Sequence, residues 1–264
     1  MEAKLLEKGK ERIAIIFKDT TPVFLNTIRR LIEEEVPTMA IEDVEVRKNT
    51  SILYDEMLAH RLGLIPLTTD LKSYNLPEEC KCEGKGCARC QVTLTLEGKG
   101  PGTVYASDIK SSDSAVKPVY SKMPIVELLK GQNIELEAVA VLGKGKVHSK
   151  WISAHVYYKH KPLITISEKC DESFSRCVEV CPTHTLEMAN KKVAVSKEHH
   201  LDCHLCQACV DASPVEGAIT VGPDSDIIFY IEPFGQLEAK KILMETVKIF
   251  ENMLNDFSKS LKEK

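Results

Sequence analysis

The segment from Thr20 to Leu67 carries the pattern that most limits how this chain can fold. Its first apolar residues recur with the period of a helix, and they are Phe24, Leu25, Ile28, Leu31 and Ile32. Thr21 suits the N-cap of that helix and Pro22 its first position, where a missing N–H costs nothing. Pro37 ends the helix because the residue before a proline avoids helical backbone angles. Such a stripe must be buried, either in the chain's own core or against a partner.

A second long helix is predicted near the C-terminus, from Leu237 to Phe257. Its apolar residues cover a wider face than a lone surface helix needs, and they are Ile242, Leu243, Val247, Ile249, Phe250, Met253, Leu254 and Phe257. The residues after Phe257 are predicted to be a solvated tail.

The rest of the chain is predicted to consist mainly of strands. Alternating or β-branched runs predict strands at 12–17, 39–46, 92–96, 134–141 and 227–231, with two further strand-like runs within 151–167. A second helix is predicted from Leu53 to Leu62, ended by Gly63, and a short helical turn from Glu127 to Lys130. The predicted fold class is therefore α+β.

Three stretches of the sequence resemble a known family. They read NTIRRLIEEEVPTMAIEDV, NTSILYDEMLAHRLGLIPL and, from Ile227 to Leu254, IIFYIEPFGQLEAKKILMETVKIFENML. They are similar to the alpha-like assembly subunits of multisubunit RNA polymerases, and most similar to the D-type subunits of the archaeal enzyme. That family is related to the third subunit of eukaryotic RNA polymerase II and to the bacterial alpha amino-terminal domain. The resemblance runs over nearly the whole chain.

The resemblance implies a three-part architecture and a role in transcription. A discontinuous dimerisation domain would join residues 1–39 and 223–264. A β-rich insert domain would cover 40–167, and a ferredoxin-like iron–sulfur domain would cover 168–222. The chain would be a non-catalytic assembly platform, and it would be enzymatic, as a nucleotidyltransferase, only as part of the DNA-directed RNA polymerase complex.

The same resemblance implies partners. The first and last helices would form a joint apolar face for a smaller alpha-like subunit, called L in archaea. That heterodimer would then nucleate assembly of the largest and second-largest catalytic subunits and of a small zinc-binding subunit. The paired cations Arg29 and Arg30 suit an acidic surface, which the resemblance assigns to the second-largest subunit. The predicted interface residues are Phe24, Ile28, Arg29, Arg30, Leu31, Leu243, Val247, Phe250 and Leu254.

Composition argues against two other classes of protein. A net charge of −4 at pH 7 gives no basic field for a duplex, so direct nucleic-acid binding is not expected. The start, MEAKLLEKGKER, has no apolar signal-peptide core, and no apolar run approaches the ~20 residues that span a bilayer. We therefore expect a cytoplasmic protein without membrane contact. In that reducing compartment, ten clustered cysteines indicate metal more than disulfides.

Five of the ten cysteines follow a degenerate two-cluster ferredoxin pattern. Cys203, Cys206 and Cys209 have the C-x2-C-x2-C spacing, but Ser213 stands where the fourth cysteine is expected. In two-cluster ferredoxins the fourth cysteine ligates the other cluster, and here Cys181, which precedes a proline, supplies it. The second cluster would need positions 171, 174, 177 and 213, of which only 177 is a cysteine.

The pattern therefore predicts a single iron–sulfur cluster, and zinc or unligated thiols are the alternatives. Its ligands would be Cys181, Cys203, Cys206 and Cys209, in a [4Fe–4S] cluster or, if Cys181 does not ligate, a [3Fe–4S] cluster. Cys170 and Cys177 are left over, either free or bonded to each other in an oxidising environment. We expect the cluster to be structural because an insert of about 55 residues needs a staple to fold.

The other four cysteines form a compact motif of their own. Cys80, Cys82, Cys87 and Cys90 have the spacing C-x-C-x4-C-x2-C. Four thiolates with glycines between them suit a tetrahedral, structural zinc site. Disulfides or free cysteines are the alternatives.

Two other functions stay open on the residues alone. A ferredoxin-type electron-transfer protein would explain the iron–sulfur motif, but the large remainder without ferredoxin character argues against it. A zinc-dependent nucleic-acid-binding module would explain the second motif, but the negative net charge argues against that.

Overall fold

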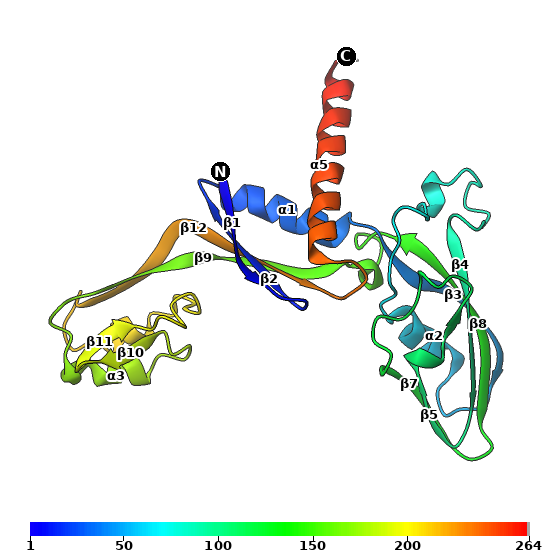
Figure 1. Cartoon of the computed structure of the whole chain (residues 1–264), viewed down its shortest axis with the longest axis horizontal. Helices are drawn as coiled ribbons and strands as arrows, with labels where there is room; N and C mark the ends of the chain where they lie inside the picture. Colours follow the sequence, from blue (N-terminus) through cyan, green and yellow to red (C-terminus); the bar gives the residue numbers. More distant parts are fainter. Residues whose placement is uncertain (263–264) are drawn as a thin grey trace. The chain divides into compact units, whose positions relative to one another are not determined.

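The computed structural model describes residues 1–262 and has the mixed α+β fold predicted from the sequence. The chain forms two compact units, each assembled from separate segments (Figure 1). Unit 1 contains residues 1–7, 14–25 and 157–230, and unit 2 contains residues 8–13, 26–156 and 231–264. Among residues 1–262, none of the helices combines the length and the apolar character needed to cross a membrane. The three domains predicted from the sequence remain a prediction.

A four-stranded sheet lies largely in unit 1. Its strands, in spatial order, are β1 (Glu2–Lys8), β2 (Ile13–Lys18), β12 (Ile219–Pro233) and β9 (Ala154–Ile166). The rings of Tyr157 and Tyr230 stack with centroids 4.8 Å apart, and Phe17 meets Phe229 edge-on at 6.1 Å. Tyr230 belongs to a small core with Ile16 and Ile228, and Tyr157 packs against that core.

The cysteine-rich segment of unit 1 forms a small substructure with a core of its own. Its elements are η4 (Glu172–Phe174), α3 (Ser175–Glu179), β10 (Leu186–Ala189), β11 (Lys192–Val195) and α4 (Ala208–Asp211). Strands β10 and β11 pair antiparallel as a hairpin. The buried Phe174, Leu186 and Ile219 form the centre of the core.

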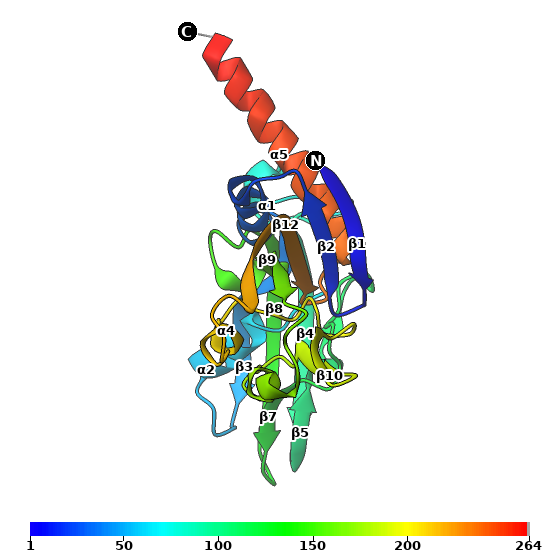
Figure 2. The ribbon, with the colours of Figure 1, turned by 90° about the vertical axis from the view of Figure 1, so that its left-hand side faces the viewer.

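Unit 2 is built on an antiparallel sheet. Its strands, in order, are β3 (Thr38–Asn49), β8 (Asn133–Gly143), β4 (Gln91–Lys99) and β6 (Lys110–Ser111), as Figures 1 and 2 show. A separate pair joins β5 (Gly102–Tyr105) to β7 (Pro124–Leu128). Leu94 and Leu96 of β4 face the core, whereas Thr95 between them is exposed, as the two-residue period of a strand requires.

Helix α2 (Asp55–Gly63) covers the core of unit 2. It buries Leu58 and Leu62 in the same cluster as β4 and β8. Three single turns, η1 (Pro77–Glu79), η2 (Ala106–Asp108) and η3 (Ser149–Trp151), connect the strands. The β-rich insert predicted for this part of the chain is therefore present.

The two long helices agree with their predicted starts. Helix α1 (Pro22–Glu34) is capped by the Thr21 hydroxyl, which accepts a hydrogen bond of 3.3 Å from the Phe24 N–H. Helix α5 (Ala239–Lys262) buries only Ile242 and Thr246 completely. Every residue of α5 from Glu251 to Lys262 is exposed, as predicted for the tail after Phe257, but residues 258–262 are also helical, and residues 263–264 of that predicted tail lie outside the described residues.

A set of buried hydrogen bonds lies where the insert leaves α1 and where the chain returns to α5. The Thr38 hydroxyl donates to the Trp151 carbonyl at 2.8 Å, and the Ser153 hydroxyl donates to the Ile32 carbonyl at 3.0 Å. The Gln236 side-chain amide donates to the Ile152 carbonyl at 3.1 Å, and the Gln236 backbone carbonyl accepts from the Thr69 N–H at 3.0 Å. We call these residues the polar joint.

The sequence-based prediction was wrong at one element and incomplete at several others. Residues Glu127–Lys130 were predicted as a helical turn, but β7 occupies Pro124–Leu128 and pairs with β5. The run is too short to show a period, and its apolar residues follow the alternation of a strand with a register shift. The two strand-like runs within 151–167 form one continuous strand, β9, and β1 was not predicted at all.

We predict that the two faces of β4 tolerate truncation differently. Leu94→Ala removes a side chain that is 1% exposed, and it should lower the free energy of unfolding of unit 2 by about 2–5 kcal/mol because a cavity remains. Thr95→Ala is the matched control on the solvent face and should change it by less than about 1 kcal/mol. Urea unfolding followed by circular dichroism measures both, and equal losses would contradict this packing.

Candidate metal centres and interface helices

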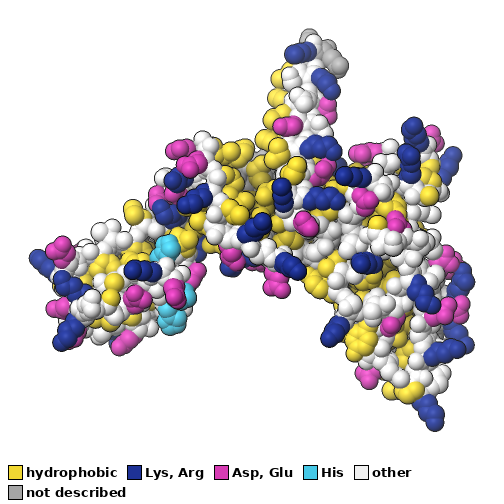
Figure 3. Space-filling model, viewed as in Figure 1, with side chains coloured by type: hydrophobic (Ala, Val, Ile, Leu, Met, Phe, Trp, Pro, Cys, Tyr) yellow, Lys and Arg dark blue, Asp and Glu magenta, His cyan; other side chains and the backbone are white. Residues whose placement is uncertain are grey.

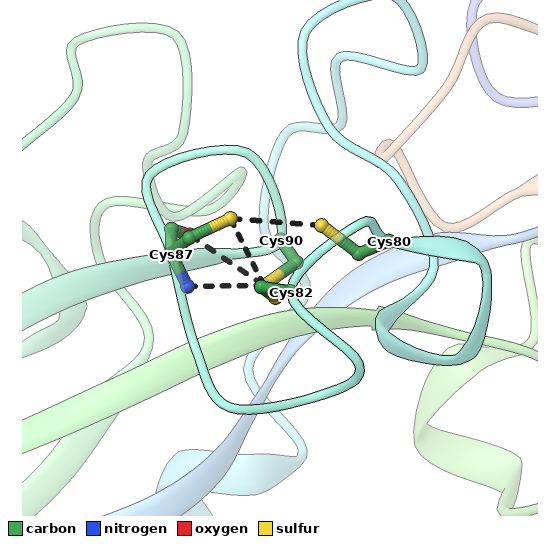
Figure 4. Close-up of side chains that lie close together, drawn as sticks. All are labelled: Cys80, Cys82, Cys87 and Cys90. Carbon is green, nitrogen blue, oxygen red and sulfur yellow. Dashed lines mark hydrogen bonds between the residues drawn. The ribbon is translucent and has the colours of Figure 1, made fainter.

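The first cysteine group lies in the loop between η1 and β4. Sulfur–sulfur distances are 3.6 Å for Cys80–Cys87, 3.5 Å for Cys82–Cys90 and 3.7 Å for Cys87–Cys90 (Figure 4). A disulfide would bring two sulfurs to about 2.05 Å, so the four thiols converge without bonding. Among the described residues, this is the only set of three or more His, Cys, Asp or Glu side chains whose ligand atoms all lie within 4.8 Å. The group could therefore hold a metal ion.

Cys82 and Cys90, two of these thiols, differ in acidity because of their contacts and burial. Hydrogen bonds from Cys80 and Cys90 lower the pKa of Cys82 to about 7. Burial, together with the contacts to Cys82 and Cys87, raises the pKa of Cys90 to about 12. A cation between the sulfurs would favour the thiolate of all four, because thiolates are the ligands that metals bind.

Glycines and a buried tyrosine shape this loop. Gly84 and Gly86 have φ values of 74° and 86°, a conformation that side chains rarely adopt, and this explains why glycines separate the ligands. The buried Tyr74 donates a hydrogen bond from its hydroxyl to Asp113, and the Asn75 N–H donates to the Arg89 carbonyl at 2.8 Å. Sequence reasoning missed Tyr74 and Asp113, which are 39 positions apart and carry no local signal.

The second cysteine group consists of the four cysteines that the ferredoxin pattern predicts as ligands, which are Cys181, Cys203, Cys206 and Cys209. Burial raises the pKa of Cys209, and the negative charges of Cys181, Cys203 and Cys206 raise it further, so these four thiols lie within electrostatic range. Left-handed φ values of 61° at Leu205 and 65° at Gln207 curl the loop that carries three of them. Within residues 1–262, no three of these sulfurs lie inside 4.8 Å of one another.

Three of the four thiols in this group are shielded from water. Cys181, Cys203 and Cys209 are buried, and Cys206 is exposed. Burial alone would raise the pKa of Cys181, but hydrogen bonds from the Leu186 N–H and from Thr183 outweigh it and lower the pKa. Hydrogen bonds of this kind stabilise a thiolate, which is the form that a metal or a cluster binds.

The two remaining cysteines share a buried core with Cys209 of that group. Cys170 and Cys177 are both completely buried in the apolar core of the cysteine-rich segment, next to Phe174. Both are free thiols in the structure, as are the other eight cysteines. Burial, together with the charge of Cys170, raises the pKa of Cys177. Their pairing as a disulfide stays a prediction.

The predicted interface residues divide between the core and the surface. On α1, Leu31 is buried and Phe24 and Ile28 are half-buried. Arg29 pairs with Glu33 at 2.6 Å and Arg30 with Glu34 at 2.9 Å, so both cations are already neutralised one helical turn away. On α5, Leu243 and Phe250 are half-buried and Val247 and Leu254 are exposed.

The exposed apolar stripe of α5 is longer than predicted. Leu261 continues the spacing of Leu254 and Phe257 and is also exposed. The sequence carried that signal, because position 261 follows 257 by one helical turn, but the predicted helix ended too early. Figure 3 shows hydrophobic side chains along one edge of this helix.

The chain is similar to known proteins both over its insert and over nearly its whole length. Residues 44–158 match the family described as the RNA polymerase Rpb3/RpoA insert domain, within the predicted insert of 40–167. The DNA-directed RNA polymerase subunit Rpo3 of Methanothermobacter thermautotrophicus is 42% identical over 255 residues, which are 94% of this chain and 94% of that protein. The chain belongs to the Rpo3 family of RNA polymerase subunits.

Two further members of the Rpo3 family have the same extent. The subunit of Methanosphaera stadtmanae is 41% identical, with 92% of each chain covered. That of Archaeoglobus fulgidus is 34% identical, covering 99% of this chain and 98% of its own. The resemblance found in the sequence is thus confirmed, whereas the ferredoxin-type electron carrier receives no support from these relatives.

We predict that Tyr74 loses its proton only in strong base. Burial, the hydrogen bond to Asp113 and the nearby carboxylates raise its pKa from 10 to about 12. Because the folded-state pKa is raised, the stabilisation is complete below pH 10 and is lost as the pH rises through about 12. Ultraviolet titration of tyrosinate should show a late step that Tyr74→Phe removes and Asp113→Asn moves to lower pH. A Tyr74 that titrates with the exposed tyrosines would contradict the contact.

Proposed function

We propose that this chain is a non-catalytic assembly subunit of DNA-directed RNA polymerase, acting in transcription only within the complex. The observation that carries the proposal is membership of the Rpo3 family over 92% or more of both chains for the relatives described above. A match of that extent includes nearly every element of the fold, so the role of the family applies to the whole chain and not to one module. Cytoplasmic location belongs to the same proposal.

The partner-binding surface in this proposal is formed by α1 and α5, and its first occupant is the smaller alpha-like subunit L. Support comes from α5, whose outer half exposes Val247, Leu254 and Phe257 to solvent. Apolar area of this kind is costly to leave in water and is typical of a surface that a partner covers. The apolar stripe of α1 would contribute to this surface through side chains that are buried or half-buried, which are Phe24, Ile28 and Leu31.

The remaining partners are the largest and second-largest catalytic subunits and a small zinc-binding subunit. Arg29 and Arg30 can contact an acidic surface of the second-largest subunit only by exchanging their partners, because Glu33 and Glu34 already bind them. Surface pairs of this kind contribute about 0–1 kcal/mol, so such an exchange is energetically accessible.

Zinc is the metal we propose for Cys80, Cys82, Cys87 and Cys90. A Zn–S bond of about 2.3 Å places the sulfurs of a tetrahedral site about 3.8 Å apart. The observed separations of 3.5–3.7 Å come close to that value before any ion is bound. Four cysteines leave no open coordination position, so the site would be structural and would fix the loop before β4.

An iron–sulfur cluster is proposed for Cys181, Cys203, Cys206 and Cys209, as [4Fe–4S], or as [3Fe–4S] if only three cysteines ligate. The ferredoxin-type spacing of these cysteines along the sequence supports a polynuclear core rather than a single ion. The role of this cluster would be structural, because a protein side chain occupies the place where a ligand of a second cluster would stand. Phe174, which replaces that ligand, is 4% exposed in the apolar core.

We predict that a charge on the α5 stripe blocks assembly. Phe257→Glu, at a side chain that is 65% exposed, should leave the chain folded but abolish its co-elution with subunit L in gel filtration. Asn252→Glu places the same charge on the opposite side of the same helix and should leave co-elution unchanged. Normal co-elution of Phe257→Glu with L would refute this surface.

We also predict that the two metals can be lost separately. Cys82→Ser should lower bound zinc by one equivalent and leave iron unchanged. Serine at Cys203, Cys206 and Cys209 together should remove iron and the brown chromophore, leave zinc unchanged and destabilise the cysteine-rich segment. Elemental analysis and visible absorbance of protein purified without oxygen measure both. A segment that remains folded without iron would contradict the structural role.

A further inference from the structure

The loop that carries Cys203, Cys206 and Cys209 contacts two long strands of unit 1. These strands are β9, which leads into the cysteine-rich segment, and β12, which leads out of it (Figure 1). They are neighbours in the four-stranded sheet. One side-chain hydrogen bond joins the loop to each strand, the first near the start of the loop and the second between its last two cysteines.

The first contact lies two residues before Cys203. The Lys159 ammonium of β9 donates a hydrogen bond to the Leu201 carbonyl, and the Leu201 side chain packs against the small core that contains Ile228. The same ammonium lies 5.9 Å from the centre of the Tyr230 ring, which is close enough for a cation–π contact. The sheet therefore orients Lys159, and Lys159 in turn holds the start of the loop.

The second contact lies between Cys206 and Cys209. The Gln207 side-chain amide donates a hydrogen bond of 2.9 Å to the Val221 carbonyl of β12, and Val221 packs against the core of the cysteine-rich segment. Gln207 has a φ of 65°, a left-handed conformation that glycine adopts at lower cost. A strained conformation of this kind persists when surrounding contacts enforce it, and the bond to Val221 is such a contact.

Ion pairs join the two strands close to both contacts. Lys161, two residues after Lys159 on β9, binds Asp224 at 2.8 Å and Asp226 at 3.5 Å, both on β12. The Asp224 carbonyl also lies 3.1 Å from Nδ1 of His160. The two strands are thus held to each other as well as to the loop, so that both loop contacts share one support.

We infer that Lys159 and Gln207 are positioning residues for the iron–sulfur site. They hold the loop on β9 and β12 without ligating the cluster, so the inference rests on the proposed cluster and adds two residues to its surroundings. Contacts that orient ligands commonly change the affinity of a metal site 10–100-fold when they are lost. A loop released at either point opens more often, and each opening exposes the cluster to chelators and oxygen.

The lifetime of the cluster in the purified full-length chain tests this inference. Lys159→Met and Gln207→Met remove the hydrogen-bond donors and keep side chains of similar length. Each should shorten the lifetime of the cluster against an iron chelator by about tenfold or more, followed by visible absorbance without oxygen. Lys197→Met, which removes the same charge from an exposed lysine of the same segment, should leave the lifetime unchanged. Lys159→Arg keeps a charged donor and should retain most of the lifetime.

Amide hydrogen exchange of the same proteins separates positioning from a general loss of stability. In both methionine variants, exchange should become faster within residues 201–209 and should stay unchanged in β4 of unit 2. Faster exchange spread evenly over the whole chain would overturn the inference, because the two residues would then act on overall stability. Slow exchange of the loop and a cluster as long-lived as that of the unchanged chain would also overturn it.

Iron content distinguishes a failure of this inference from a failure of the proposed function. If the unchanged chain binds iron and both methionine variants lose it no faster, the inference fails and the proposed cluster stands. If the unchanged chain purified without oxygen contains no iron, the proposed cluster is wrong, and the inference fails with it.

Discussion

The polar joint fixes the place where the insert of unit 2 leaves the rest of the chain and returns to it. An insert of this length must leave the helical part of the chain and return to it at nearly the same point, and a return of this kind buries backbone carbonyls that no sheet or helix satisfies. Thr38, Ser153 and Gln236 supply the missing donors from three separate passes of the chain. Leaving one such group unpaired costs about 1–3 kcal/mol, so the joint admits little variation.

The two cysteine groups lie in two small substructures of the chain. Neither substructure has a large core, and in each the cysteines come from separate turns of loop. Around Cys80 to Cys90 the sulfurs are close enough to surround one ion, while Cys181, Cys203 and Cys206 lie within electrostatic range of Cys209. A segment without enough apolar area to fold alone can gain the difference from ligation.

The apolar stripes of helices α1 and α5 differ in how far the chain itself buries them. Leu31 packs into the chain's own core, whereas every residue of α5 from Glu251 to Lys262 is exposed. The period of 3.6 predicted that both were amphipathic, but it could not distinguish a face buried within the chain from one covered by another chain. Arg29 and Arg30 show the same limit, since their pairing with Glu33 and Glu34 follows from the rotamers and not from the order of residues.

The sequence by itself determined the α+β class, the start of both long helices and the family, because these depend on local period, on capping chemistry and on motifs read along the chain. The spacing of Cys80, Cys82, Cys87 and Cys90 also indicated that these four thiols form one group. Only the tertiary structure decided that residues 124–128 form a strand, that Tyr74 contacts Asp113 and that the apolar stripe of α5 is exposed beyond Glu251 rather than covered by the chain itself. Each of these depends on what lies opposite a residue in space, and a pattern along one chain does not contain that information.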